Sequence, residues 1–111
     1  MTIAPTSPAH DFTFSSTLHQ ITHAPRYWGQ CIEQIMALWQ PTDELILLAE
    51  AAQGYADSRL DFFDQLYLLD HDADFLGLVN GMVNNQARYK TIDYAQWAQV
   101  VLKHQRHITW K

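Results

Sequence analysis

The chain has 111 residues, enough for one domain with a single hydrophobic core. Hydrophobic residues make up 48% of it and aromatic residues 13%, which excludes a largely disordered protein and favours a soluble globular one. The formal net charge of -5 opposes binding to a phosphate backbone, and no apolar run approaches the roughly 20 residues of a membrane span.

Residues 1–15 are predicted to form a flexible arm, because Pro5 and Pro8 stand among Ser, Thr and Ala residues that follow no helical or strand period. The first ten residues have neither the basic nor the apolar region of a secretion signal, so we expect a cytoplasmic protein. A single domain is expected over residues 16–111. Its first strand is predicted at Thr17–Ile21, where β-favouring residues lead to a proline.

An amphipathic helix is predicted from Arg26 to Trp39, because its apolar positions recur at intervals of three and four residues. Pro25 suits the first turn of this helix, and Pro41 ends it. The following segment contains an uninterrupted apolar run from Leu45 to Ala49, which predicts a central strand covered on both faces. A helix that leads into a buried strand is half of a parallel α/β unit.

Two further elements are predicted in the middle of the chain. Residues 51–60 allow a short helix, although Gly54 lies inside it. The run Gln65–Leu69 then predicts a second buried strand. Asp72 is expected to cap a helix over Ala73–Val79.

A loop is expected around Gly81 and Asn84-Asn85, followed by a short strand at Tyr89–Ile92. Asp93 is predicted to cap a last helix that reaches about as far as His104, and an edge strand is expected at Ile108–Trp110. This order of elements is typical of a three-layer α/β/α sandwich around a mainly parallel sheet of about five strands.

Asp70, Asp72 and Asp74 have the first three spacings of a calcium-binding loop. Phe75 and Gly81, however, stand where that loop requires glycine and a bidentate glutamate. We interpret the segment as a solvated turn and helix cap.

His104 and His107 are three residues apart and could share a helix face as metal ligands. No third ligand is identified, so we interpret them as surface histidines near a helix C-terminus and expect no metal. With Lys103, Arg106 and Lys111 they form a small basic cluster. That cluster lacks the density of a nucleic-acid-binding face.

Cys31 is the only cysteine, which excludes an intramolecular disulfide and a cysteine-type structural zinc site. It falls on the apolar face of the predicted first helix, where a lone cysteine usually behaves as a small buried hydrophobe. A reactive thiolate would need an exposed helix N-terminus or a cation, and Arg26 and His23 are near enough in sequence to leave that open. Cys31 is therefore the one catalytic candidate that we retain.

The sequence contains no Gly-rich phosphate loop, no Gly-x-Ser-x-Gly elbow and no His-Glu-x-x-His motif. We therefore expect no cofactor, and the residues alone favour an interaction subunit over an enzyme.

Several segments together resemble the TusB/DsrH family of sulfur-relay subunits, over about residues 17–110. The most specific parts are the Leu-His start of the first strand, the Ile-Asp-Tyr entry to the last helix and the Lys-His to Trp ending. The segments are Thr17-Leu18-His19 followed by Ala24-Pro25, DELILL at Asp43–Leu48, LYLLDHDADFLGL at Leu66–Leu78 and IDYAQWAQVVLKHQRHITW at Ile92–Trp110.

The resemblance implies a DsrE/F/H-like fold and a place in a heterohexamer with TusC-like and TusD-like subunits. Such a complex receives persulfide sulfur from a TusA-like carrier. It passes the sulfur through a TusE-like protein toward 2-thiouridine at the wobble position of certain tRNAs. In the family the sulfur-carrying cysteine belongs to the TusD-like subunit, so the resemblance implies a non-catalytic, structural subunit. The negative net charge and the small basic cluster predict that this subunit does not bind nucleic acid directly.

Two positions depart from the family pattern. The first-helix cysteine of some DsrH members falls nearer to Met36, so Cys31 does not match it. Family members also commonly place Asp-Gly after the central strand, where this chain has Ala51-Ala52.

Two other functions remain open. One is a persulfide-carrying sulfurtransferase subunit that acts through Cys31. The other is an independent protein-interaction module of helical type, which would require the apolar runs at Leu45 and Leu66 to be helical.

Overall fold

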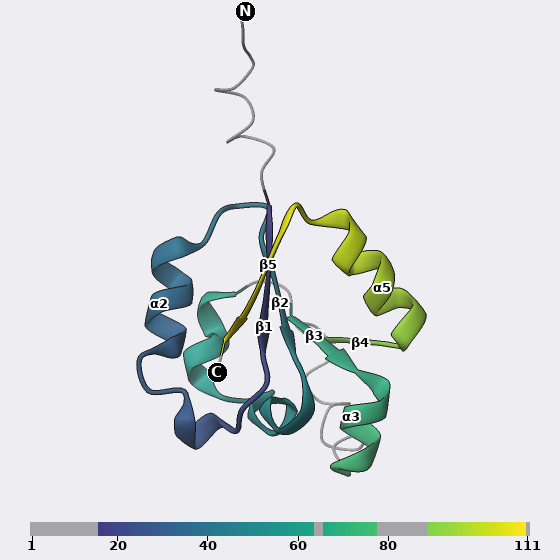
Figure 1. Ribbon diagram of the computed structural model, residues 1–111. Helices are drawn as coiled ribbons and strands as arrows, with labels where there is room; N and C mark the ends of the chain where they lie inside the picture. The colour runs from purple at the N-terminus through teal and green to yellow at the C-terminus, as the bar shows by residue number, and fades with distance from the viewer. Residues whose placement is uncertain (1–15, 64–65, 78–88, 111) are drawn as a thin grey trace, which may run out of the picture.

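The computed structural model describes residues 16–63, 66–77 and 89–110. Within them, a five-stranded sheet has the order β4-β3-β2-β1-β5, and every neighbouring pair is parallel (Figure 1). The strands are β1 (Thr17–Ile21), β2 (Glu44–Leu47), β3 (Leu66–Leu69), β4 (Tyr89–Ile92) and β5 (Arg106–Trp110). The predicted α/β sandwich is confirmed, whereas the helical module is contradicted because both apolar runs are strands.

Helices cover both faces of the sheet (Figure 1). One face carries α2 and the short 3-10 helices η1, η2 and η3, and the other carries α5. A further short helix, α3, follows β3 directly. The helices are η1 (Pro25–Tyr27), α2 (Cys31–Leu38), η2 (Ala49–Gly54), η3 (Ser58–Phe62), α3 (Asp70–Phe75) and α5 (Tyr94–Lys103).

The two faces of the sheet contribute to two hydrophobic clusters. In β2, Leu45 and Leu47 belong to the cluster beneath α2, whereas Ile46 belongs to the cluster beneath α5. Successive side chains of a strand point to opposite faces, so a strand that is covered on both sides needs an unbroken apolar run. The prediction of a central strand buried on both faces is therefore confirmed, although β2 ends at Leu47.

The continuous helix predicted from Arg26 to Trp39 is wrong. Pro25 begins the short helix η1, and α2 begins only at Cys31. Between them Gly29 has φ +35°, which lies outside the right-handed helical region. Trp28 occupies the interruption with a fully buried ring, and its indole Nε1 donates a hydrogen bond to the carbonyl of His23 at 2.9 Å.

The helix after β3 also differs from its prediction. It begins at Asp70, and Asp72 does not cap it, because the Asp72 carboxylate accepts a hydrogen bond from the backbone N–H of Ala49 at 2.8 Å. The predictions for the arm at 1–15, for Val79 and for the loop at 81–85 lie outside the described residues.

The last helix begins as predicted. Asp93 accepts the backbone N–H of Gln96 at 2.7 Å, and the Gln96 side chain accepts the backbone N–H of Asp93 at 2.9 Å. This reciprocal capping box satisfies two donors that the first turn would otherwise leave unpaired.

Gly54 lies where no side chain fits. A Cβ atom at this position would come within 2.7 Å of Cγ of Pro25 and 2.9 Å of Cζ2 of Trp28. We expect Gly54→Ala to lower the free energy of unfolding by about 1 to 3 kcal/mol through overpacking, as measured by chemical denaturation. The control Gln53→Ala, at an exposed neighbour in η2, should stay within about 0.5 kcal/mol of wild type. Equal stability of Gly54→Ala and wild type would contradict the close contact.

Candidate functional site

Buried polar side chains gather where the parallel strands begin. Asp43 and Glu44 lie side by side at the start of β2, and their carboxylates serve opposite faces of the sheet. Because β1 and β5 run parallel to β2, they begin at the same edge of the sheet. The two acidic residues therefore organise two separate polar networks.

Asp43 is the centre of the network on the α2 face. Its carboxylate accepts the backbone N–H of Thr17 at 2.9 Å, the backbone N–H of Gln40 at 3.0 Å and Nε2 of His19 at 3.1 Å. Asp43 is only 6% exposed, so these donors replace the water that a carboxylate would otherwise bind. The network joins the start of β1 to the turn before β2.

His19 continues this network to the last strand. Because Nε2 donates to Asp43, Nδ1 is left with a lone pair, and it accepts Nε1–H of Trp110 at 3.2 Å. The imidazole is also stacked on Trp39 and on Trp110, with ring centroids 5.3 Å and 6.1 Å away. Burial lowers the pKa of His19 below its ordinary value of 6.5, and the hydrogen bond to Asp43 offsets this only in part.

In nucleophilic enzymes an Asp residue orients a His base toward the nucleophile, but here the second ring nitrogen of His19 has a different partner. Nδ1 of His19 faces the N–H donor of Trp110, whereas a catalytic base would face a hydroxyl or thiol. The arrangement is therefore a structural hydrogen-bond chain from β2 through β1 to β5.

Glu44 is the centre of the network on the α5 face. It accepts the hydroxyl of Tyr67 at 2.7 Å, Nε2 of His104 at 2.7 Å and the ammonium group of Lys103 at 2.9 Å. Burial acts to raise the pKa of Glu44, but the hydrogen bonds from Lys103, His104 and Tyr67 outweigh it and hold the pKa below its usual value. The other nitrogen of His104 lies 3.0 Å from Oγ of Ser16, which ties the network to the start of β1.

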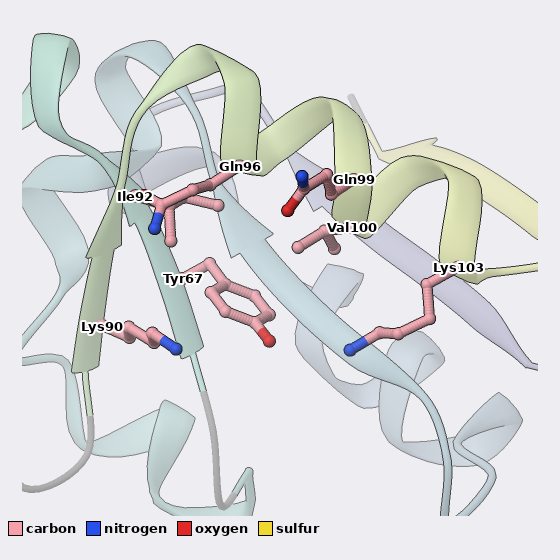
Figure 2. Close-up of a pocket in the computed structure, with 7 residues that line it drawn as sticks. All are labelled: Tyr67, Lys90, Ile92, Gln96, Gln99, Val100 and Lys103. Atoms are coloured by element: carbon pink, nitrogen blue, oxygen red, sulfur yellow. The ribbon is translucent and has the colours of Figure 1, made fainter.

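A pocket of about 260 Å³ adjoins this second network (Figure 2). Its floor is formed by Tyr67 of β3 and Ile92 of β4, and α5 forms its roof. Its lining combines apolar side chains with amides and ammonium groups. The remaining lining residues are Lys90 from β4 and Gln96, Gln99, Val100 and Lys103 from α5.

A second hollow of about 260 Å³ lies at the opposite edge, after β2 and β3. Ligands of parallel α/β proteins commonly bind at this carboxyl edge. Here Asp72 holds the backbone N–H of Ala49, which has the left-handed φ of 52°. The lining of this hollow includes Glu50, His71 and the exposed Phe75.

Cys31, the catalytic candidate from the sequence, lies apart from both networks. It is the first residue of α2, it is 9% exposed, and it belongs to the hydrophobic cluster of Trp28 and Ile35. Burial raises the pKa of the Cys31 thiol. The position at a helix N-terminus is therefore not accompanied by the exposure or the thiolate character that a sulfur carrier needs.

The interpretation of His104 and His107 as surface histidines is wrong for His104. This residue is 5% exposed, and its two ring nitrogens form hydrogen bonds with Glu44 and Ser16. His107 lies in β5 and bonds the carbonyl of Val101 at 2.7 Å, so the two rings do not share a helix face. Within the described residues, no group of three or more His, Cys, Asp or Glu side chains could hold a metal ion.

The basic cluster predicted near the C-terminus is partly committed to the fold. Lys103 pairs with Glu44, and Nε of Arg106 donates to the hydroxyl of Thr17 at 3.2 Å. Lys111 lies outside the described residues.

Sequence reasoning did not find His19, Asp43, Glu44 or Tyr67 as members of a site. The available signal was the acidic pair at the start of an otherwise apolar strand. Such carboxylates at a strand entrance need buried donors, but the sequence does not say which residues supply them.

Comparison with protein-family models, with curated proteins and with solved structures gives no match for this chain. In the part of the chain that the structure describes, no helix has the length and hydrophobicity to cross a membrane.

The environment of His19 predicts a pH dependence of stability. Its pKa in the folded protein lies below the ordinary 6.5, so the unfolded chain takes up a proton first as the pH falls. The stabilisation is therefore full above pH 6.5, and it is lost as the pH falls below 6.5 toward the lower pKa of His19 in the folded protein. We expect the free energy of unfolding to decrease from about pH 7.5 to about pH 5.5, and to decrease less in His19→Gln.

The matched control is His71→Gln, which makes the same substitution at an exposed histidine and should keep the wild-type pH dependence. Urea denaturation at each pH measures the effect. Identical slopes for wild type and His19→Gln would contradict the assignment of a neutral, buried imidazole.

Proposed function

We propose that this chain is a non-catalytic, cytoplasmic subunit of a TusBCD-type sulfur-relay complex that supports 2-thiouridine formation at the tRNA wobble position. One observation carries the proposal. The segments that resemble the TusB/DsrH family, although far apart in sequence, supply most of the residues of the two buried polar networks.

The Leu-His start of β1 contributes His19, and the DELILL segment contributes Asp43 and Glu44. The C-terminal segment contributes His104 and Trp110. Their side chains bond one another, and among the described residues no nucleophile is hydrogen-bonded to the His19 ring. Family-like residues that hold the sheet together are what a structural subunit requires, and the five-stranded sandwich agrees with the fold that the resemblance implies.

Exposed aromatic side chains on α3 and α5 also favour a subunit of an assembly. The exposed rings of His71 and Tyr94 have centroids 5.9 Å apart, and the centroid of the half-buried Trp97, which packs against the core beneath α5, is 6.2 Å from that of Tyr94. Phe75, on the same helix as His71, is 83% exposed. Adjacent exposed aromatic residues are enriched at protein interfaces.

Co-expression tests the proposal. We expect the untagged chain to co-purify with tagged TusD-like and TusC-like proteins at a stoichiometric ratio, as measured by gel filtration and native mass spectrometry. The control is expression of the two partners without the chain, which should give a smaller assembly. A chain that stays monomeric in the presence of both partners would contradict the proposal.

Cys31 distinguishes this function from that of a persulfide carrier. Because the thiol is buried among apolar side chains, we expect Cys31→Ala to leave tRNA 2-thiolation in cells nearly unchanged. Its free energy of unfolding should fall by about 1 kcal/mol for the lost packing. Mass spectrometry of the purified subunit should detect no persulfide. Loss of thiolation in a variant that still folds and assembles, or a persulfide on Cys31, would establish the carrier function instead.

A further inference from the structure

The pocket beneath α5 is not used by the proposed relay function. It is open to solvent between α5 and the strands β3 and β4, and it is lined by polar and apolar side chains (Figure 2). Its volume of about 260 Å³ is near the lower limit for pockets that hold small molecules. The chemistry of its lining indicates what kind of molecule would fit.

Two ammonium groups point into the pocket. Figure 2 shows Lys90 and Lys103 reaching in from opposite sides of the Tyr67 ring, one from β4 and the other from α5. The ammonium group of Lys103 also forms an ion pair with Glu44 at 2.9 Å. Lys90 forms no ion pair or hydrogen bond with the residues that the structure describes, so its charge is available to a ligand.

The floor of the pocket is uncharged. Tyr67 donates its hydroxyl to Glu44, and burial together with that hydrogen bond raises the pKa of Tyr67 to about 12. The phenol therefore stays protonated at neutral pH and does not repel an anion. Its ring, together with Ile92 and Val100, offers an apolar surface, and the Gln99 side chain extends toward it (Figure 2).

The charges at the pocket favour an anion although the whole chain is acidic. Lys90 and Lys103 contribute two positive charges, and the carboxylate of Glu44 cancels one of them. Glu44 is only 13% exposed, and the Tyr67 hydroxyl and Lys103 occupy its oxygens, so it presents little negative surface to the pocket. A local positive excess remains in a chain whose net charge is -5.

We propose that this pocket binds a small organic anion, a carboxylate or phosphate monoester joined to a short apolar group. The charged head lies between the ammonium groups of Lys90 and Lys103, and the apolar body packs on Tyr67, Ile92 and Val100. The proposal is independent of the sulfur-relay assignment, because it rests only on the lining of the pocket.

The test is a titration of the ¹⁵N-labelled full chain, followed by NMR, with benzoate, phenyl phosphate, inorganic phosphate and the neutral benzyl alcohol. We expect saturable shifts at Lys90, Gln99 and Lys103 with a dissociation constant of about 1 mM for the better aromatic anion. The stronger of benzoate and phenyl phosphate identifies the head group. Inorganic phosphate lacks the apolar body and benzyl alcohol lacks the negative charge, so each should bind more weakly than the aromatic anions. Shifts that do not saturate, or equal binding of benzyl alcohol, would overturn the proposal.

Variants separate this pocket from general attraction of anions to the surface. Lys90→Gln should weaken binding about fivefold, the size expected for one exposed charge pair, and Lys90→Arg should restore most of it. Arg26→Gln removes the same charge from η1 on the other face of the sheet and should leave the affinity unchanged. If Lys90→Gln binds like wild type, or if Arg26→Gln weakens binding equally, the proposal fails. Lys90 would then serve only to protect the edge strand β4 from pairing.

Discussion

The buried carboxylate of Asp43 is the constraint on which the rest of the structure depends. A carboxylate removed from water is stable only when donors surround it, and Asp43 obtains them from Thr17, Gln40 and His19. These donors come from β1 and from the turn that enters β2. A shift of β1 by one residue would remove the Thr17 N–H and turn His19 to the other face of the sheet. The bonds to Asp43 therefore favour the observed register, in which Leu18 lies beside Glu44.

Glu44 extends this constraint to the other layer. Because neighbouring residues of a strand face opposite sides, the pair Asp43-Glu44 places one carboxylate under α2 and the next under α5. Through Tyr67 and His104, Glu44 fastens β3 and the entrance to β5. Two adjacent residues thus connect four of the five strands by side-chain hydrogen bonds, in addition to the backbone ladders.

These hydrogen bonds also limit the chemistry that is possible where the strands begin. The polar groups at the amino ends of the strands bond one another, and the thiol of Cys31 is enclosed by hydrocarbon on the α2 face. Beside the pocket beneath α5, Lys90 keeps a charge that has no partner among the described residues. The polar motifs at this edge thus serve the stability of the domain itself.

The sequence by itself determined the fold class, because uninterrupted apolar runs at Leu45 and Leu66 require strands that are covered on both faces. It also determined the start of α5, where Asp93 and Gln96 interact within one helical turn. Only the tertiary structure decided that Trp28 interrupts the first helix, that Asp72 accepts the backbone N–H of Ala49, and that His104 is buried. The partners of His104 are 60 and 88 residues away, so its environment is created by chain segments that meet only after folding. Local patterns report periodicity and capping, whereas burial of a polar group depends on which distant donor or acceptor the fold brings to it.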